Sequence, residues 1–150
     1  ISDCKGDPDA LQVIFDARPE VLNHNVETVP RLQRAARPSA SYARSLAVLA
    51  RAKAAGLTTK SSLIVGMGET FDELVGTLAD LRGIGVDIVT IGQYLRPSSE
   101  HIELVRYVHP DEFVEMKREA LALGFKHVES GPLVRSSYHA DQSAHASGLL

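Results

Sequence analysis

The stretch from Val86 to Tyr94, VDIVTIGQY, most constrains what this chain can fold into. It is almost wholly apolar until Gly92, and stretches with helical spacing precede and follow it. A strand that is nearly continuously apolar belongs in a parallel sheet that helices cover on at least one face. The sequence therefore predicts an α/β fold with a buried parallel strand at this position.

The remaining sequence alternates between strand-like and helix-like stretches. Strands are predicted at 21–26, 58–65, 86–94 and 125–128, and helices at 9–15, 29–36, 41–55, 110–123 and from 70 to 83 or 85. Ser41 is a candidate N-cap, and Thr70 with Glu73 has the spacing of a capping box. This alternation indicates right-handed βαβ units. We find no linker, so residues 1–141 are expected to form one unit and residues 142–150 a mobile tail.

Length and charge narrow the classes of function. The 150 residues suffice for one domain or a portion of a larger one, and the net charge of -3 does not indicate a basic nucleic-acid or membrane-surface binder. No run approaches the ~18 apolar residues of a membrane span, and a single cysteine excludes an internal disulfide framework. We therefore expect neither a nucleic-acid nor a membrane partner. Because the chain begins at Ile1 and directly in turn-forming residues, we also expect an upstream part to be missing.

Polar residues gather after the first predicted strand, in the motif NHNVET. Asn23, Asn25 and Glu27 alternate, so in an extended chain they point the same way. Two amides and a carboxylate in line can hydrogen-bond a ribose or an amino group. The alternative is an ordinary capped turn from strand to helix, and His24, on the other side, is interpreted as structural.

Three further groups of residues are candidates for binding. Two glycines in SSLIVGMGET, Gly66 and Gly68, would let a ligand approach the backbone and its free N–H groups, or would simply form a strand-to-helix turn. Arg44 could pair with Glu27 or clamp a ligand carboxylate, unless it is an exposed helix arginine; Arg34 and Arg37 are weaker candidates. Gln93 and Tyr94 end the most buried strand, where polar groups tend to line a pocket.

The segment RSSYH, residues 135–139, cannot form a hydrophobic core. It is either a serine-rich loop or a source of a hydroxyl that ligates a metal. A serine nucleophile would need a base within reach, and the G-x-S-x-G elbow is absent. The histidines show no H-x-x-x-H pairing, so no zinc site is predicted from this chain alone. We assign no catalytic residue.

Taken together, these segments resemble the C-terminal half of the lipoyl synthases, a family of radical S-adenosylmethionine (SAM) enzymes. The matching stretches are DARPEVLNHNVETVPRL, YARSL, TKSSLIVGMGET, GVDIVTIGQYLRP and SGPLVRSSYHAD, in this order, over roughly residues 3 to 141. The resemblance implies the C-terminal portion of an open, partial parallel β/α barrel of the radical SAM type.

The resemblance also implies an activity and its cofactors. These are SAM and two [4Fe-4S] clusters, one that cleaves SAM to a 5′-deoxyadenosyl radical and an auxiliary one that donates sulfur. Sulfur is inserted at C6 and C8 of an octanoyl chain carried on a lysine of a lipoyl-carrier domain. The implied partners are the octanoylated carrier domains and a low-potential electron donor such as ferredoxin or flavodoxin. The implied location is the cytoplasm, or the mitochondrion in a eukaryote.

The family binds its clusters mainly through cysteine triplets that do not occur here. Cys4 stands outside those motifs, so the resemblance implies that this chain is inactive alone. One cluster ligand would remain, because the family uses a serine of its R-S-S motif on the auxiliary cluster. That serine is Ser137 or Ser136, with Ser137 preferred.

The other polar strand ends would form the SAM site. SSLIVGMGE is similar to the G-x-I-x-G-x-x-E strand of radical SAM proteins, with Gly66 in place and Ser62 where glycine is usual. By resemblance, Asn25 and Glu27 would meet the ribose or the methionyl amine and Arg44 the methionyl carboxylate. Gln93 and Tyr94 would lie on the adenine side.

Two other functions remain open at this point. One is a different radical SAM sulfur-inserting enzyme, such as a biotin synthase, although the RSSYH segment is particular to lipoyl synthases. The other is a non-catalytic α/β module, which the missing cysteine motifs favour if this chain is taken by itself.

Overall fold

The computed structural model describes residues 1–137 and is built on a parallel sheet. Its four strands lie in chain order: β1 (Val21–Asn23), β2 (Thr58–Val65), β3 (Ile88–Gln93) and β4 (His127–Ser130). The α/β class and the parallel sheet are confirmed, and the arrangement fits part of an open β/α barrel. Of the predicted unit 1–141, the last four residues lie outside the described residues, as does the whole tail predicted at 142–150.

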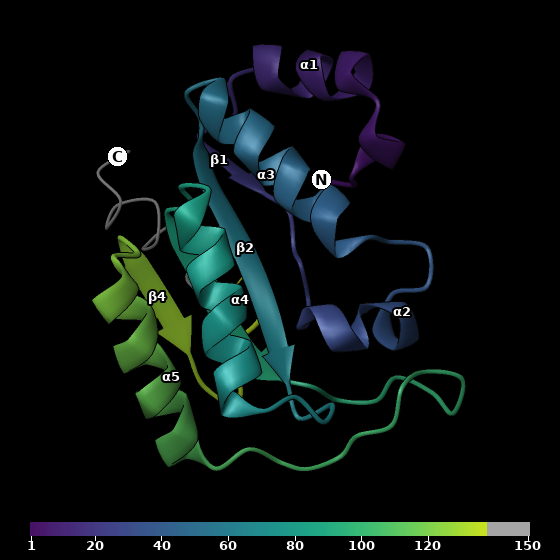
Figure 1. The fold of residues 1–150 in the computed structure, drawn as a ribbon, viewed down its shortest axis with the longest axis vertical. Coiled ribbons are helices and arrows are strands. Elements are labelled where there is room, and N and C mark those ends of the chain that lie inside the picture. The colour runs from purple at the N-terminus through teal and green to yellow at the C-terminus, as the bar shows by residue number, and fades with distance from the viewer. Residues whose placement is uncertain (138–150) are drawn as a thin grey trace.

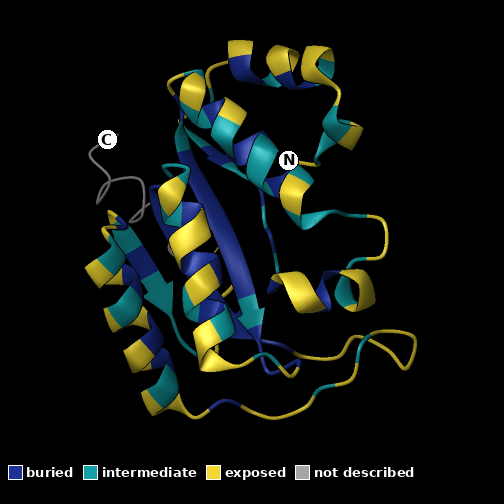
Figure 2. Cartoon of the chain, viewed as in Figure 1, coloured by how far each residue is buried: buried dark blue, intermediate teal, exposed yellow. Residues whose placement is uncertain are grey.

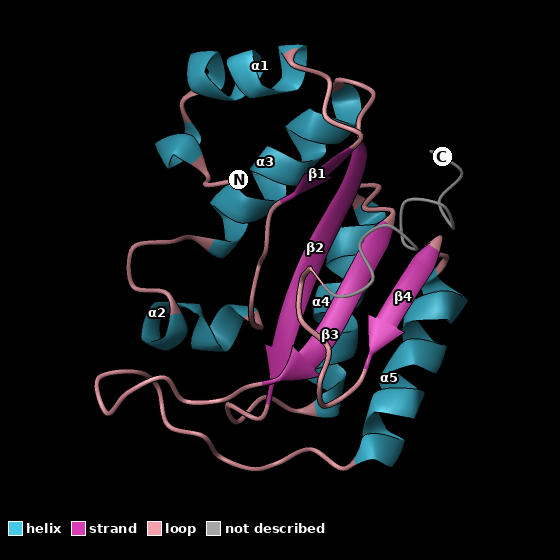
Figure 3. Ribbon diagram, turned by 180° about the vertical axis from the view of Figure 1, so that it is seen from behind, coloured by secondary structure: helices cyan, strands magenta, loops and turns pink. Residues whose placement is uncertain are grey.

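The helices are α1 (Pro8–Asp16), α2 (Gln33–Ala36), α3 (Tyr42–Ala54), α4 (Phe71–Gly83) and α5 (Pro110–Leu123), with short 3-10 turns η1 (Cys4–Gly6) and η2 (Pro30–Leu32). The first of them, α1, precedes β1, whereas the others lie in the connections between strands, and α3, α4 and α5 cover one face of the sheet. Figure 1 shows α3, α4 and α5 in front of the sheet. Figure 3 shows the opposite face, where the segment after β4 runs back across the strands. One face is therefore left for loops and cavities.

The predicted helix boundaries are confirmed where local chemistry defines them. The Ser41 hydroxyl accepts a hydrogen bond from the N–H of Arg44, and Thr70 and Glu73 form the reciprocal capping box. Gly124 closes α5 in the left-handed conformation, with φ of 100°. These caps satisfy backbone groups at the helix ends that would otherwise be unpaired.

Three predicted strands have different bounds in the structure, and the one predicted at 86–94 is β3, which spans only Ile88–Gln93. β1 ends at Asn23 rather than at residue 26, and the chain meets β2 again only through an isolated bridge between Glu27 and Leu63. β4 begins at His127 rather than at residue 125, because Phe125 packs into the core and the ladder starts opposite Ile88.

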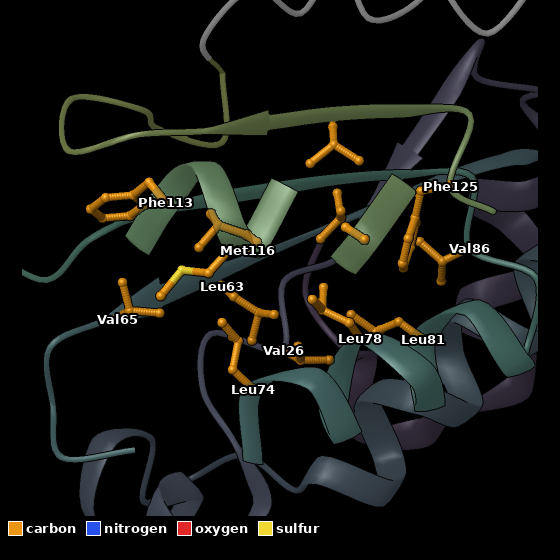
Figure 4. Packing of buried hydrophobic residues seen from close by; sticks show 14 of the residues in the cluster. Val26, Leu63, Val65, Leu74, Leu78, Leu81, Val86, Phe113, Met116 and Phe125 are labelled. Atoms are coloured by element: carbon orange, nitrogen blue, oxygen red, sulfur yellow. The ribbon is translucent and has the colours of Figure 1, made fainter. Parts of the chain in front are cut away.

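The main hydrophobic core lies between the sheet and the helices (Figure 4). It includes Val26, Leu63, Val65, Leu74, Leu78, Leu81, Phe113 and Met116. Along β2, successive side chains point to opposite faces, so Leu63 and Val65 enter this core whereas Ser62 and Ile64 face the other side. Figure 2 shows β2 buried along most of its length and the outer helix faces exposed. Within residues 1–137, no helix has the length and apolar character needed to cross a membrane.

Candidate functional site

Three cavities adjoin at the carboxyl ends of β1, β2 and β3, and Glu27 lines all of them. The amide cavity, of about 300 Å³, contains Asn23, Asn25 and Arg37 in its wall. The loop cavity, of about 130 Å³, is lined among others by Thr90 and Ser136. The apolar cavity, of about 480 Å³, is lined among others by Ile64, Met67, Tyr94 and Ile102. In parallel α/β folds, ligands bind at this edge of the sheet.

A larger cavity, of about 540 Å³, lies elsewhere, between α1 and the end of α3. Its wall includes Leu11, Phe15 and Arg51 and none of the residues that follow the strands. It lies near the amino end of β2, so we do not regard it as the functional site.

The backbone of Glu27 is held in an unusual conformation. Its φ of 67° lies in the left-handed region, which costs a non-glycine residue roughly 1–3 kcal/mol. Two backbone hydrogen bonds to β2 maintain it. The N–H of Glu27 donates to the Ser62 carbonyl oxygen at 3.0 Å, and the N–H of Ile64 donates to the Glu27 carbonyl oxygen at 2.8 Å. Such residues concentrate at ligand clamps, and here the conformation brings the carboxylate to the junction of the cavities.

Asn23, Asn25 and Glu27 all line the amide cavity, and so does His24, which the alternation had placed on the other side. The side-chain oxygens of Asn23 and Asn25 are buried without a hydrogen-bond partner among the described residues. A buried acceptor left unpaired costs about 1–3 kcal/mol. Hydroxyl or ammonium donors of a ligand would satisfy these oxygens.

His24 has the structural role predicted for it. Its ring is buried, with Nε2 at 2.9 Å from the Ser45 hydroxyl and Nδ1 at 3.0 Å from the Ile1 oxygen. Burial is the main cause that lowers the pKa of His24, so the ring is neutral near pH 7.

In the glycine turn, the N–H groups of Gly66 and Met67 donate to a side chain of the same turn and are not free for a ligand. The Glu69 carboxylate accepts from the N–H of Gly66 at 2.7 Å and of Met67 at 3.0 Å. A Cβ at Gly66, whose φ is 105°, would lie 2.5 Å from both the Arg106 oxygen and the Gln93 amide nitrogen. The expectation of free N–H groups was therefore wrong at Gly66 and Met67, and Gly66 is needed for close packing of the chain.

Gln93 and Tyr94 have different roles. Nε2 of Gln93 donates to the oxygens of Tyr94 and Arg106 at 3.0 and 3.1 Å, and its Oε1 accepts from the Val108 N–H at 2.8 Å. Because the Gln93 side-chain amide donates both of its hydrogens to backbone oxygens, this arrangement does not support the predicted contact of Gln93 with adenine. Tyr94 does line the apolar cavity, anchored by a 2.7 Å hydrogen bond from its hydroxyl to the Ile102 oxygen.

Arg37, rather than Arg44, is the candidate arginine that lines the cavities. Arg44 forms an ion pair of 3.4 Å with Asp3 and is not part of the wall of the three cavities, so its predicted pairing with Glu27 was wrong. Arg37, which the sequence ranked lower, lines both the amide cavity and the apolar cavity. The position of Pro38 directly after it was the available sequence signal.

The R-S-S segment lies across β3. Gly92 has no Cβ, and the Val134 carbonyl occupies the space that a Cβ would need. Arg135 donates to the Val134 and Gln93 oxygens at 2.8 and 3.4 Å. Ser136 is half-buried in the wall of the loop cavity, and Ser137 is exposed. Tyr138 and His139 lie outside the described residues.

The described residues fit SAM better than they fit a complete iron–sulfur cluster. Unpaired amide oxygens beside a carboxylate suit the hydroxyl and ammonium groups of SAM. By contrast, residues 1–137 contain no group of three His, Cys, Asp or Glu side chains that could hold a metal ion. The R-S-S serines could complete a cluster but could not assemble one.

Comparison with known proteins decides the family. The sequence model described as the Radical SAM superfamily matches residues 2–81, which is more than half of the chain. The chain belongs to the radical SAM superfamily. The matched region contains β1, β2 and the glycine turn, including Asn25, Glu27 and Gly66. Membership implies the use of SAM and of iron–sulfur chemistry.

Curated relatives are similar over nearly the whole chain. A lipoyl synthase of Rubrobacter xylanophilus is 57% identical over 142 residues, which cover 93% of this chain and 44% of the relative. One of Mycobacterium avium is 59% identical over 140 residues (93% and 46%), and one of Halalkalibacterium halodurans is 55% identical over 143 residues (94% and 47%). The resemblance to lipoyl synthases is confirmed, and the chain spans a little under half the length of these relatives.

Proposed function

We propose that this chain is the SAM-binding and C-terminal part of a lipoyl synthase. The complete enzyme inserts two sulfur atoms, at C6 and C8, into a protein-bound octanoyl chain. The observation that carries the proposal is the position of Glu27 at the junction of three cavities, beside the unpaired amide oxygens of Asn23 and Asn25, in a chain 57% identical to a lipoyl synthase.

The chain's own residues bind and orient SAM in this proposal. Asn25 and Glu27 accept hydrogen bonds from the ribose hydroxyls or the methionyl ammonium, and Ile64 and Tyr94 provide an apolar wall for the adenine. Bound beside a reduced [4Fe-4S] cluster, SAM supplies a 5′-deoxyadenosyl radical. The cysteines that hold this cluster belong to another part of the enzyme.

The R-S-S segment supplies one ligand to a second, auxiliary [4Fe-4S] cluster, the sulfur donor. We favour Ser137, whose side chain is exposed, and Ser136, in the wall of the loop cavity, is the alternative. A serine oxygen is a harder ligand than thiolate and binds iron less tightly, which suits a cluster that is consumed. The substrate is an octanoylated lipoyl-carrier domain and the electron donor a ferredoxin or flavodoxin, in the cytoplasm or the mitochondrion.

The activity is tested on the complete protein that contains this chain, with both clusters reconstituted without oxygen. Supplied with SAM, reductant and an octanoylated carrier domain, it should release 5′-deoxyadenosine and add two sulfur atoms to the carrier, as read by mass spectrometry. SAM cleavage without sulfur insertion would contradict the lipoyl synthase proposal but retain the superfamily chemistry.

Glu27→Gln should weaken SAM binding about 10–100-fold, because a hydrogen bond to a charged group contributes about 1.5–3 kcal/mol. The matched control is Glu20→Gln, which changes an exposed carboxylate just before β1 and should leave the SAM affinity unchanged. Equal affinities of the two variants would contradict the placement of SAM at Glu27.

The serine assignment has a separate test. Ser137→Ala should alter the electron paramagnetic resonance spectrum of the auxiliary cluster and abolish sulfur insertion, yet leave SAM cleavage intact. Ser136→Ala should change neither. The opposite result would move the ligand to Ser136, and no effect from either variant would exclude a serine ligand in this segment.

A further inference from the structure

Arg37 occupies a position that its sequence context explains. It follows the last residue of α2 and precedes Pro38, whose ring disfavours helical geometry at the residue before it. The backbone of Arg37 accordingly leaves the helix, with φ of -141° and ψ of 71°. Its side chain is half-buried and lines both the amide cavity and the apolar cavity.

One side of the Arg37 guanidinium is fixed by neutral oxygens. Its Nη1 donates to the Val26 carbonyl at 2.8 Å and to Gln33 Oε1 at 3.2 Å, and lies 3.5 Å from the Ser45 hydroxyl. Gln33 is itself held by hydrogen bonds to the oxygens of Val26 and Thr28, at 2.7 and 2.6 Å. The guanidinium is therefore positioned by a network of buried groups before any ligand arrives.

The other two nitrogens of the Arg37 guanidinium, Nε and Nη2, are available as donors. Within residues 1–137, Nε and Nη2 of Arg37 have no hydrogen-bond partner and the side chain forms no ion pair, unlike Arg44 with Asp3 or Arg31 with Glu73. Burial lowers the pKa of Arg37, while the nearby charges of Glu27 and Asp3 raise it. A partly buried cation without a paired anion is costly, and a planar carboxylate is its best partner.

We propose that Arg37 binds the methionyl carboxylate of SAM, an inference that rests on the proposed function. Arg37 is the only Lys or Arg among the residues that line the amide cavity. The Glu27 carboxylate in the same cavity would repel a second carboxylate, and the unpaired side-chain oxygens of Asn23 and Asn25 can only accept hydrogen bonds. The methionyl end of SAM carries an ammonium and a carboxylate, so the acceptors take the first and Arg37 the second.

The test compares two ligands that differ only in the carboxylate. In the complete, cluster-reconstituted protein, the dissociation constants of SAM and of decarboxylated SAM are measured by calorimetry for the wild type and four variants. Arg37→Gln should weaken SAM binding about 10–100-fold and leave the affinity for decarboxylated SAM unchanged. Arg44→Gln should change neither affinity. The matched control is Arg34→Gln, on the exposed side of the same short helix, which should also change neither.

Each other outcome overturns the inference in a recognisable way. Equal weakening of both ligands by Arg37→Gln would mean a structural role, and a carboxylate-selective loss in Arg44→Gln would assign the carboxylate to Arg44. Arg37→Lys retains the charge if the Gln variant fails to fold, and it too should weaken only SAM. If the wild type binds neither ligand, the proposed function fails with the inference. If the wild type binds SAM but Arg37→Lys changes the affinities for SAM and for decarboxylated SAM equally, only the inference fails.

Discussion

At Gly92, the absence of a side chain determines where the R-S-S segment lies. A Cβ there would overlap the Val134 carbonyl oxygen and come within 3.3 Å of the Arg135 guanidinium. The backbone oxygen cannot move without lifting the whole segment, and with it Ser136 in the wall of the loop cavity. One missing methyl group thus controls the access of a candidate metal ligand to the site.

Gly92→Ala should displace residues 131–136 and lower the free energy of unfolding by about 1–3 kcal/mol, as overpacking does. The measurement is urea unfolding of the complete protein. The control is Gly76→Ala in α4, where a Cβ meets nothing within 4 Å and should stabilise the helix by roughly 0.5–1 kcal/mol. Equal stability of Gly92→Ala and the wild type would show that the segment is not held over β3.

The buried carboxylate of Asp87 makes the stability of the protein depend on pH. This carboxylate accepts from Lys53 at 2.9 and 3.0 Å and from the Thr59 N–H at 2.9 Å, with Lys126 at 3.5 Å. Burial raises the pKa of Asp87, but the hydrogen bonds and charges outweigh it, so the pKa is lowered overall. The stability from this group is therefore complete above its unfolded pKa of about 4 and lost as pH falls through the folded pKa.

Asp87→Asn should cost about 1–3 kcal/mol at pH 7, and the difference from wild type should shrink as the pH falls below about 4. Urea unfolding of both proteins at several pH values measures this. Asp72→Asn, at an exposed carboxylate of α4, serves as the comparison. A cost for Asp87→Asn that is independent of pH would show that the ionised carboxylate contributes nothing.

At the scale of elements, the sequence predicted what local chemistry determines. Ser41 and Thr70 begin α3 and α4, and Gly124 ends α5, each through groups within four residues, so these helices were placed nearly to the residue. The ends of β1 and β4 depend on pairing with distant strands, and neither could be read locally.

The same distinction separates the site predictions. Alternation was enough to place Asn25 and Glu27 in the wall of one cavity, although Glu27 is left-handed rather than extended. The choice of Arg37 over Arg44 depends on how the connection from α2 to α3 turns, and the role of Gln93 on a loop that folds back to Val108. Both are tertiary facts without a local sequence signal as strong as a cap.

One ion pair joins two elements at the carboxyl edge. Arg31 of η2 binds Glu73 of α4 through two hydrogen bonds of 2.9 Å, and this pairing, with the N–H of Thr70, lowers the pKa of Glu73 to about 2. Arg31→Gln should raise the pKa of Glu73 toward its ordinary value without reaching it, because Thr70 still donates. An NMR titration of the Glu73 carboxyl measures the shift, and an unchanged pKa would mean that the pair is not formed in solution.

At the scale of the whole molecule, the described sheet is open at both sides. β1 and β4 each pair with a single neighbour, so each presents unpaired backbone groups along one edge. We expect residues 1–150 produced alone to self-associate, which size-exclusion chromatography with light scattering would reveal. A monomeric protein with a cooperative thermal transition would contradict this expectation.

The central claim is that SAM binds at the three cavities around Glu27, and an experimental structure of the complete protein with SAM tests it most directly. The account predicts the adenine beside Ile64 and Tyr94, the ammonium or ribose at Asn25 and Glu27, and the carboxylate at Arg37. SAM bound at another place, with these side chains free of it, would contradict the account.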